Sequence, residues 1–227
     1  MMSNLAPDLD VPEPARVDAA WRKIARGALK PWCRLEVSGQ QHVPATGGVL
    51  IASNHLSHAD SLALGLAVRK RAVSFLGDER LTETPIIGRR LKSLGMMTLR
   101  RGDADLEALE RLVALLGAGH AVVVYPEGSR SRTGEVHRPR SGVARVAAMA
   151  GVPVVPAGVL GTQNLWPIDA NPRPRGARVQ VRFGPPSSPA SNSGRDRRAF
   201  NEQLHEALVG LAGAPRADHF SPVGGVQ

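Results

Sequence analysis

Short apolar runs alternate with longer amphipathic stretches along most of the 227-residue chain. Apolar runs of roughly four to eight residues, bounded by Gly, Pro or polar residues, are typical of buried strands. The sequence predicts strands over 34–37, 48–53, 72–76, 96–99, 121–125, 152–159 and 177–183. Apolar residues spaced three and four apart are typical of helices that pack on one face. This spacing predicts helices over 59–70, 85–94, 104–116, 141–150 and 195–211.

The order of these segments predicts an α/β fold. Alternating strands and helices are typical of a layered domain with a largely parallel sheet, and a chain of this length suits one domain at roughly 150 residues per domain. We therefore expect a single domain with a central mixed, largely parallel sheet of about seven strands flanked by helices. Asp103 and Ser141 are predicted helix N-caps, while Gly117 and Gly119 are expected to end the third helix.

The two ends of the chain differ in composition from this middle part. Residues 1–15 are acidic and rich in Pro, which predicts a disordered leader, and residues 213–227 are predicted to be a flexible tail. The domain itself is expected over 34–212. The leader lacks the basic and apolar regions of a signal peptide. Gly and Pro interrupt the longest uncharged stretch, 146–166, so no transmembrane span is predicted.

Residues 16–33 are predicted to form a basic amphipathic helix. Tryptophans and aliphatic residues share one side of that helix, and Lys and Arg lie largely around the other. Tryptophan next to clustered cations is typical of a helix that lies in a membrane interface. The alternative is an ordinary amphipathic helix packed on its own domain, and one helix can do both. We expect a peripheral (monotopic) protein on the cytoplasmic side of the cell membrane.

The charge balance indicates a polyanionic partner. Lys and Arg exceed Asp and Glu by nine, and the pI is near 11.0. This excess suits nucleic acid, an anionic membrane or a phosphorylated substrate, although 4% aromatic residues argue against base stacking. The single cysteine, Cys33, excludes an internal disulfide and a Cys-rich zinc site, suits a reducing compartment, and lies far from any motif that would make it a nucleophile.

The densest polar cluster follows the second predicted strand. Ser53-Asn54-His55-Leu56-Ser57-His58-Ala59-Asp60 lies between that strand and the next helix. Open α/β sheets bind ligands at this edge, and a His paired with a carboxylate suits general-base catalysis. We expect His55 to be the base and Asp60 to orient it, with His58 as the competing base. There are two alternatives: a metal site formed by both histidines and Asp60, and a polar turn that caps the helix.

Arginines follow other predicted strands. The strand at 121–125 leads into Pro126-Glu127-Gly128-Ser129-Arg130-Ser131-Arg132, Arg138 and Arg140 precede the fourth helix, and Arg100-Arg101 follow 96–99. The arginine fork binds phosphate with two hydrogen bonds, so these residues predict a phosphate clamp beside the base. The chain has no P-loop, no dinucleotide fingerprint and no G-x-S-x-G nucleophile elbow.

These motifs resemble the glycerolipid acyltransferases with an N-H-x-x-x-x-D motif, and most closely the 1-acylglycerol-3-phosphate (lysophosphatidate) O-acyltransferases. Four blocks match in order. Asn54-His55 with Asp60 resembles the first block, and residues 95–101 resemble the second. Tyr125-Pro126-Glu127-Gly128-Ser129-Arg130-Ser131 is similar to the F-P-E-G-T-R-S block, and residues 152–156 resemble the fourth. Tyr125, Ser129 and Arg140 replace the family's usual Phe, Thr and Lys.

The resemblance implies an O-acyltransferase of phospholipid biosynthesis. It implies acyl transfer from a thioester donor, acyl-CoA or acyl-carrier protein, to the free hydroxyl of lysophosphatidate, with no cofactor and no metal. His55 and Asp60 are then the catalytic residues. The implied substrate-binding residues are Asn54, Arg101, Glu127, Gly128, Ser129, Arg130 and Arg140.

Three other functions remain open from the sequence. The chain resembles enzymes whose expected partners are a lysophospholipid, a thioester donor and an anionic membrane surface, with no nucleic acid. An acyltransferase or transacylase for another lysophospholipid uses the same residues. A basic nucleic-acid-binding domain is the alternative from another class, and sparse aromatic residues argue against it. Intact His55 and Asp60 argue against a non-catalytic lipid-binding relative.

Overall fold

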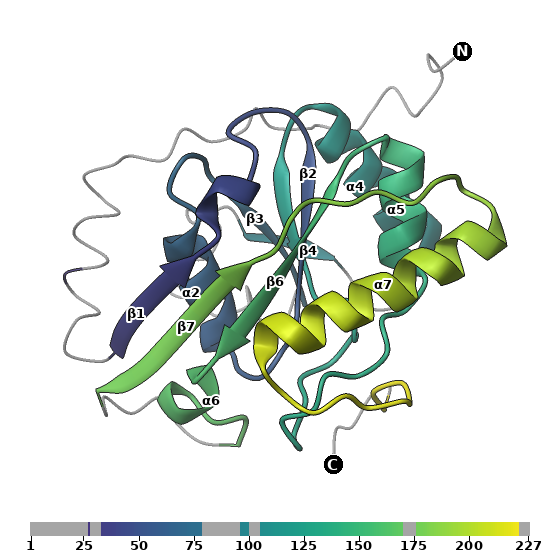
Figure 1. Cartoon of the computed structure of the whole chain (residues 1–227). Coiled ribbons are helices and arrows are strands. Elements are labelled where there is room, and N and C mark those ends of the chain that lie inside the picture. The colour runs from purple at the N-terminus through teal and green to yellow at the C-terminus, as the bar shows by residue number, and fades with distance from the viewer. Residues whose placement is uncertain (1–26, 28–32, 79–95, 100–104, 170–175, 223–227) are drawn as a thin grey trace.

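The computed structural model describes residues 27, 33–78, 96–99, 105–169 and 176–222. The strands are β1 (Cys33–Ser38), β2 (Val49–Ser53), β3 (Ser74–Asp78), β4 (Met96–Leu99), β5 (Ala121–Val124), β6 (Val154–Leu160) and β7 (Ala177–Phe183). The helices are η1 (Gln40–His42), α2 (Ala59–Ala67), α4 (Asp105–Gly117), α5 (Gly142–Ala150), α6 (Thr162–Leu165) and α7 (Gly194–Ala212). The fold is the predicted α/β arrangement in which helices flank one sheet (Figure 1).

The seven strands form one sheet in the order β1-β7-β6-β2-β5-β3-β4. Every neighbouring pair is parallel except β6 and β7, which are antiparallel. The expectation of a mixed, largely parallel sheet is therefore confirmed. β2 lies in the middle of the sheet and all five of its residues are buried, because helices cover both faces of a parallel sheet of this kind.

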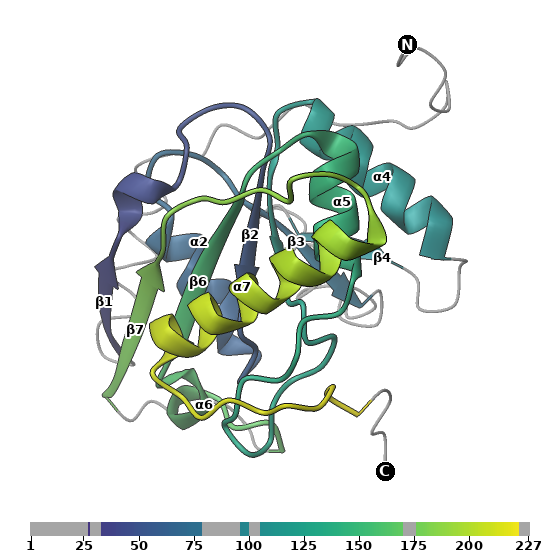
Figure 2. The ribbon, with the colours of Figure 1, turned by 45° about the vertical axis from the view of Figure 1, so that its right-hand side comes forward.

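Two hydrophobic clusters occupy the two faces of the sheet. Alternate residues of β2 point to opposite sides, so Val49 and Ile51 pack with α2, while Leu50 and Ala52 pack with α4, α5 and α7. Figures 1 and 2 show α7 crossing in front of the sheet and α2 behind it. The molecule therefore has three layers: α2, the sheet, and the helices α4, α5 and α7.

One edge of the sheet collects the ends of its central strands. β2, β5 and β6 are mutually aligned, so their carboxyl ends meet at this edge. β7 runs antiparallel to β6, and β1 runs parallel to β7. β1 therefore begins, at Cys33, on the edge where β2 ends.

Several helix ends differ from their predicted positions. α2 ends at Ala67 rather than residue 70 because Val68 takes an extended conformation. The Ser141 side chain accepts no capping hydrogen bond, contrary to the expectation that it caps α5. α7 has such a cap, since the Ser193 hydroxyl accepts a hydrogen bond from the backbone N–H of Asp196 at 3.1 Å. The short helices η1 and α6 were not predicted.

The structure describes ten residues beyond the expected domain boundary at residue 212. Residues 213–222, predicted as part of a flexible tail, pack beside the loop between β5 and α5 and hydrogen-bond to it through the backbone. Hydrogen bonds between backbone groups leave no signal in a Pro- and Gly-rich composition, which explains the difference. The leader over 1–15, the helix predicted over 85–94 and Asp103 lie outside the described residues, as does all of the basic 16–33 segment except Gly27 and Cys33.

None of the helices in the described ranges combines the length and the apolar composition that crossing a bilayer requires.

Candidate active site

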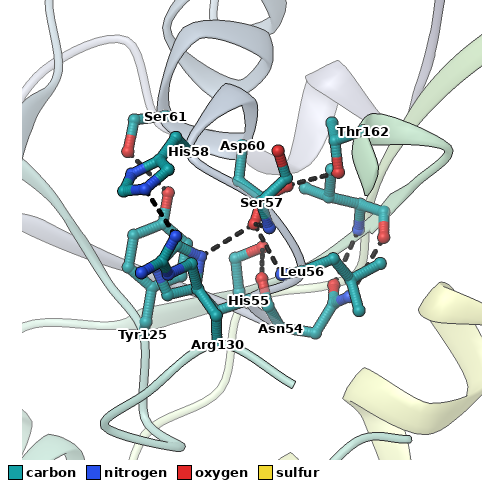
Figure 3. Close-up of polar contacts among 12 residues, drawn as sticks. Asn54, His55, Leu56, Ser57, His58, Asp60, Ser61, Tyr125, Arg130 and Thr162 are labelled. Atoms are coloured by element: carbon teal, nitrogen blue, oxygen red, sulfur yellow. Dashed lines mark hydrogen bonds and ion pairs between the residues drawn. The ribbon is translucent and has the colours of Figure 1, made fainter. Parts of the chain in front are cut away.

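His55 and Asp60 lie together in the turn between β2 and α2, as the sequence predicted. The Nδ1 atom of His55 is 2.8 Å from Oδ2 of Asp60 (Figure 3). The Asp60 side chain is fully buried, and the His55 side chain is 18% exposed. One partner is therefore sealed in the protein while the other keeps an edge open to a substrate.

The surroundings of Asp60 determine which nitrogen of His55 is the proton acceptor. Oδ2 of Asp60 also accepts hydrogen bonds from the backbone N–H groups of Leu56 at 2.7 Å and Ser57 at 2.9 Å, and Oδ1 accepts one from the Thr162 hydroxyl. A carboxylate with these partners is an acceptor only, so Nδ1 of His55 carries a proton and donates it. Nε2 of His55 is then unprotonated in the neutral ring, as a general base requires.

The His55 ring is also held by an aromatic neighbour. It stacks on Tyr125 with the ring centres 3.8 Å apart and the planes 11° from parallel. Burial raises the pKa of Tyr125 well above its ordinary value, so the phenol stays neutral, and its oxygen is 2.8 Å from the Ser61 hydroxyl. Tyr125 therefore fixes the plane of the catalytic ring and brings no charge to it.

Asn54 holds the turn in place. Its side-chain amide donates to the carbonyl of Val159 at 3.0 Å and accepts from the N–H of the same residue at 2.7 Å. Asn54 is 1% exposed. Both the nitrogen and the oxygen of its side-chain amide hydrogen-bond to the backbone of β6. Asn54, which the sequence placed among the substrate-binding residues, therefore joins the end of β2 to β6.

His58, the competing base, lies beside an arginine. Its Nε2 hydrogen-bonds to Nη1 of Arg130, and because a guanidinium only donates, Nε2 accepts. Burial and the positive charge of Arg130 both lower the pKa of His58. His58 thus orients Arg130, and no metal reaches that nitrogen while this bond is made. Within the described residues, no group of three or more His, Cys, Asp or Glu is arranged to hold a metal ion.

Glu127 is a fully buried carboxyl group that joins two segments of the chain. Oε1 accepts from the backbone N–H of His55 at 3.0 Å, and Oε2 accepts from the backbone N–H of His137 at 2.9 Å and lies 3.1 Å from Nδ1 of the same residue. Burial raises the pKa of Glu127 to about 7, although the hydrogen bonds from the two backbone N–H groups oppose that rise. Glu127 therefore ties the catalytic turn to the β5–α5 loop (residues 125–141) from inside the protein.

The remaining predicted residues of the β5–α5 loop lie at its outer side. Gly128 has φ +82°, and a Cβ there would approach Nε of Arg140 to 2.9 Å, so only Gly suits this position. Arg140 donates from Nε to the Glu127 carbonyl at 3.3 Å and from Nη2 to the Ser221 carbonyl at 2.8 Å. The Ser129 hydroxyl contacts that of Ser221.

Some functional residues were missed by the sequence, and one lies outside the described part of the chain. Thr162 and His137 complete the surroundings of Asp60 and Glu127, yet both are single polar residues without a motif around them. Tyr125 was noted only as a replacement for Phe. Arg101, the arginine predicted after β4, is not among the described residues. The site therefore assembles residues 54–60 with the β5–α5 loop and Thr162 at one sheet edge.

Known proteins share sequence similarity with this chain. A family model described as Acyltransferase matches residues 34–160. The chain is 31% identical over 150 residues to 1-acyl-sn-glycerol-3-phosphate acyltransferase LPAT1, chloroplastic, of Arabidopsis thaliana, covering 65% of this chain and 41% of that protein. It is 27% identical over 143 residues to the 1-acyl-sn-glycerol-3-phosphate acyltransferase of Bacillus subtilis, covering 61% of this chain and 71% of that protein.

A solved structure has the same fold. The crystal structure of the 1-acyl-sn-glycerophosphate (LPA) acyltransferase PlsC from Thermotoga maritima matches with a TM-score of 0.66 and 24% identity, over 85% of this chain and 77% of that chain. The match to the plant protein spans about two fifths of that protein's length. The resemblance predicted from the four sequence blocks is confirmed, and since the matched model covers more than half of the residues, the chain belongs to the acyltransferase family.

Proposed function

We propose that this protein transfers a fatty acyl group from a thioester donor to the free hydroxyl of lysophosphatidate, giving phosphatidate for phospholipid biosynthesis. The observation that carries the proposal is the His55–Asp60 pair, which lies at the same sheet edge as Arg130 and whose histidine side chain is 18% exposed. The printed names of the plant and bacterial relatives assign them this acceptor, which supports the same substrate class here.

The proposed reaction uses His55 as base and then as acid. Nε2 of His55 takes the proton of the acceptor hydroxyl while the hydroxyl oxygen attacks the thioester carbonyl carbon. The carbon–sulfur bond then breaks, and the imidazolium returns the proton to the leaving thiolate. Asp60 keeps Nδ1 protonated and stabilises the imidazolium through the 2.8 Å hydrogen bond. No acyl-enzyme is needed, and such general-base assistance is typically worth about 10²–10⁴ in rate.

The acceptor phosphate is proposed to bind the arginines of the β5–α5 loop. Arg130 is oriented by His58, and Arg140 is oriented by two carbonyls. Arginine forks of this kind bind phosphate oxygens in pairs, and each charge-assisted hydrogen bond is worth roughly 1.5–3 kcal/mol. Arg101 is proposed as a further ligand because the resemblance assigns it that role.

A membrane surface is the proposed location of the substrate. The strand β1 begins at the edge that carries the site, and its first residue, Cys33, is the last residue of the basic segment predicted over 16–33. Cations near an anionic leaflet each contribute about 1 kcal/mol to binding. This geometry supports a peripheral protein whose site faces the bilayer from which it takes a lysolipid.

Purified full-length protein tested with acyl-CoA and acyl-carrier protein, against a panel of lysophospholipids, checks the proposal. We expect labelled acyl chains to appear in phosphatidate, fastest with lysophosphatidate. Faster transfer to a lysolipid with another head group would show that the acceptor is wrong. Transfer from an intact phospholipid without a thioester would indicate a transacylase. No transfer together with salt-sensitive DNA binding would favour the nucleic-acid alternative.

A further inference from the structure

The chain beyond α7 forms a strap, residues 213–222, beside the β5–α5 loop. Gly213, with φ +57°, ends α7 and turns the chain back. The backbone N–H of Val136 then donates to the Pro215 carbonyl at 2.9 Å, and the N–H of Ala217 donates to the Val136 carbonyl at 3.0 Å. Figures 1 and 2 show the strap and the loop along the same side of the molecule. The strap lies outside residues 34–160, the part that the family model matches.

The strap is fixed in register along its length. The N–H of Arg138 donates to the His219 carbonyl at 3.1 Å. The rings of His137 and His219 meet edge to face with their centres 5.1 Å apart. Ala217 and Ser221 are each 3% exposed. Two buried side chains and several paired backbone groups therefore hold the strap against the β5–α5 loop.

Ser221 contacts two residues that the resemblance assigns to acceptor binding. Its hydroxyl hydrogen-bonds to the Ser129 hydroxyl, and its carbonyl accepts from Nη2 of Arg140 at 2.8 Å. The neighbouring Phe220 ring has the Arg140 guanidinium carbon 5.7 Å from its centre. The strap therefore touches the β5–α5 loop at its polar residues as well as along its backbone.

These contacts restrict Arg140 and leave part of it open. Nε and Nη2 are bound to the carbonyls of Glu127 and Ser221, which fixes the plane of the guanidinium. Within the described part of the chain, Nη1 of Arg140 has no hydrogen-bond partner. A side chain held in one orientation loses less entropy when an anion binds it.

We propose that the strap is part of the acceptor side of this site, and that Ser221 is a positioning residue that holds Ser129 and Arg140 in the orientation that binds the acceptor phosphate. The proposal rests on the proposed function, because it assigns the phosphate to these residues. It adds a segment from outside the matched family region to the acyltransferase site.

The test compares two substitutions in the full chain and one shortened chain with wild type. Ser221→Ala removes the hydroxyl contact with Ser129 and keeps the backbone. A chain that ends after Ala217 also removes the carbonyl that binds Arg140. Asp218→Asn is the matched control, because Asp218 lies in the same strap, is exposed, and pairs with Arg216 among the residues that the structure describes. Steady-state kinetics with lysophosphatidate and a thioester donor are combined with calorimetric binding of lysophosphatidate alone.

We expect Ser221→Ala to raise KM and Kd for lysophosphatidate about three- to tenfold, the value of one lost neutral hydrogen bond. The donor KM and kcat should stay within about twofold, since neither His55 nor Asp60 is touched. The shortened chain should show a larger acceptor effect, and Asp218→Asn none. Weaker lysophosphatidate binding by Ser221→Ala in a protein that transfers no acyl group supports the strap and contradicts the reaction.

Other outcomes overturn the proposal. Unchanged acceptor KM and Kd in Ser221→Ala would show that the hydroxyl positions nothing. Equal losses in kcat and in both Michaelis constants, with a lowered Tm, would make the strap a general structural element. A wild-type chain that neither binds nor acylates lysophosphatidate would overturn this proposal together with the proposed function.

Discussion

The catalytic turn and the β5–α5 loop are held in opposite ways. Asp60 is fully buried and accepts hydrogen bonds from two backbone N–H groups of its own turn, so the catalytic pair is fixed largely by residues adjacent in sequence. Arg130 and Arg140 are only partly buried and are oriented by His58 and Ser221, which belong to other segments. In the proposed function, proton transfer would depend on a rigid local turn, and phosphate binding would depend on the way distant segments meet.

Replacing the base should give the largest effect. His55→Ala removes the only proton acceptor that the turn directs at the substrate, so kcat should fall by about 10²–10⁴. The acceptor KM should change little, because the arginines remain. Single-turnover rates at saturating acceptor measure this loss, and circular dichroism checks that the variant is folded.

A histidine remote from the site provides the control for that measurement. His42 lies in η1, which follows the end of β1 and is therefore at the sheet edge opposite the one that carries the site. His42→Gln should keep the wild-type rate. Near-full activity of His55→Ala would exclude this residue as the base. The assignment of proton transfer to the turn and of phosphate binding to the loop would then be wrong.

Replacing an arginine of the loop should act on binding rather than on rate. Arg130→Ala removes a charged partner of the acceptor phosphate, worth roughly 1.5–3 kcal/mol, so the acceptor KM should rise about tenfold to a hundredfold. Arg130→Lys keeps the charge and loses the fork, so its KM should be intermediate. Measured kcat values for both should stay near wild type. An unchanged KM in Arg130→Ala would move the phosphate elsewhere.

Replacing Glu127, which joins the turn to the β5–α5 loop, should have the smallest effect on rate and a measurable effect on the free energy of unfolding. Burial raises the pKa of Glu127 from 4.5 to about 7, so the folded chain binds more protons than the unfolded chain between these values. The stabilisation from this group is complete below pH 4.5 and is lost as pH rises to about 7. The free energy of unfolding of wild type, relative to Glu127→Gln, should therefore fall over that window by on the order of 3 kcal/mol.

Urea unfolding of both proteins at a series of pH values measures that difference. The comparison isolates Glu127 because His58, whose lowered pKa gives a contribution of opposite sign, is present in both chains. Parallel stability curves for the two proteins would show that Glu127 is ionised in the folded state throughout the window.

Local sequence predicted the core of the sheet and the catalytic pair because both depend on neighbouring residues. Apolar runs mark β2 and β5, and His55 and Asp60 are five residues apart in one turn. The same reasoning failed for contacts across the chain. Thr162 is 102 residues from Asp60, and the amide of Asn54 meets Val159 at a distance of 105 residues. Nothing in the sequence next to a lone Thr or Asn specifies such a partner.

The tail illustrates the same limit for backbone groups. Residues 213–222 contain small and Pro residues that are typical of a flexible end, and the prediction of flexibility followed from them. The structure places them by N–H and carbonyl groups that every sequence possesses. The family match ends at residue 160 and therefore does not include this segment.

The contacts of the catalytic turn with the segment from Val159 to Trp166 have a consequence for synthesis of the chain. Asn54, Ser57 and Asp60 all hydrogen-bond to that segment, which the ribosome adds about a hundred residues later. Contacts so distant in sequence form slowly, after the entropy of closing a long loop has been overcome. A nascent chain that contains the whole 54–60 motif therefore still lacks the contacts that join this turn to the sheet, and it gains them only when β6 and α6 dock.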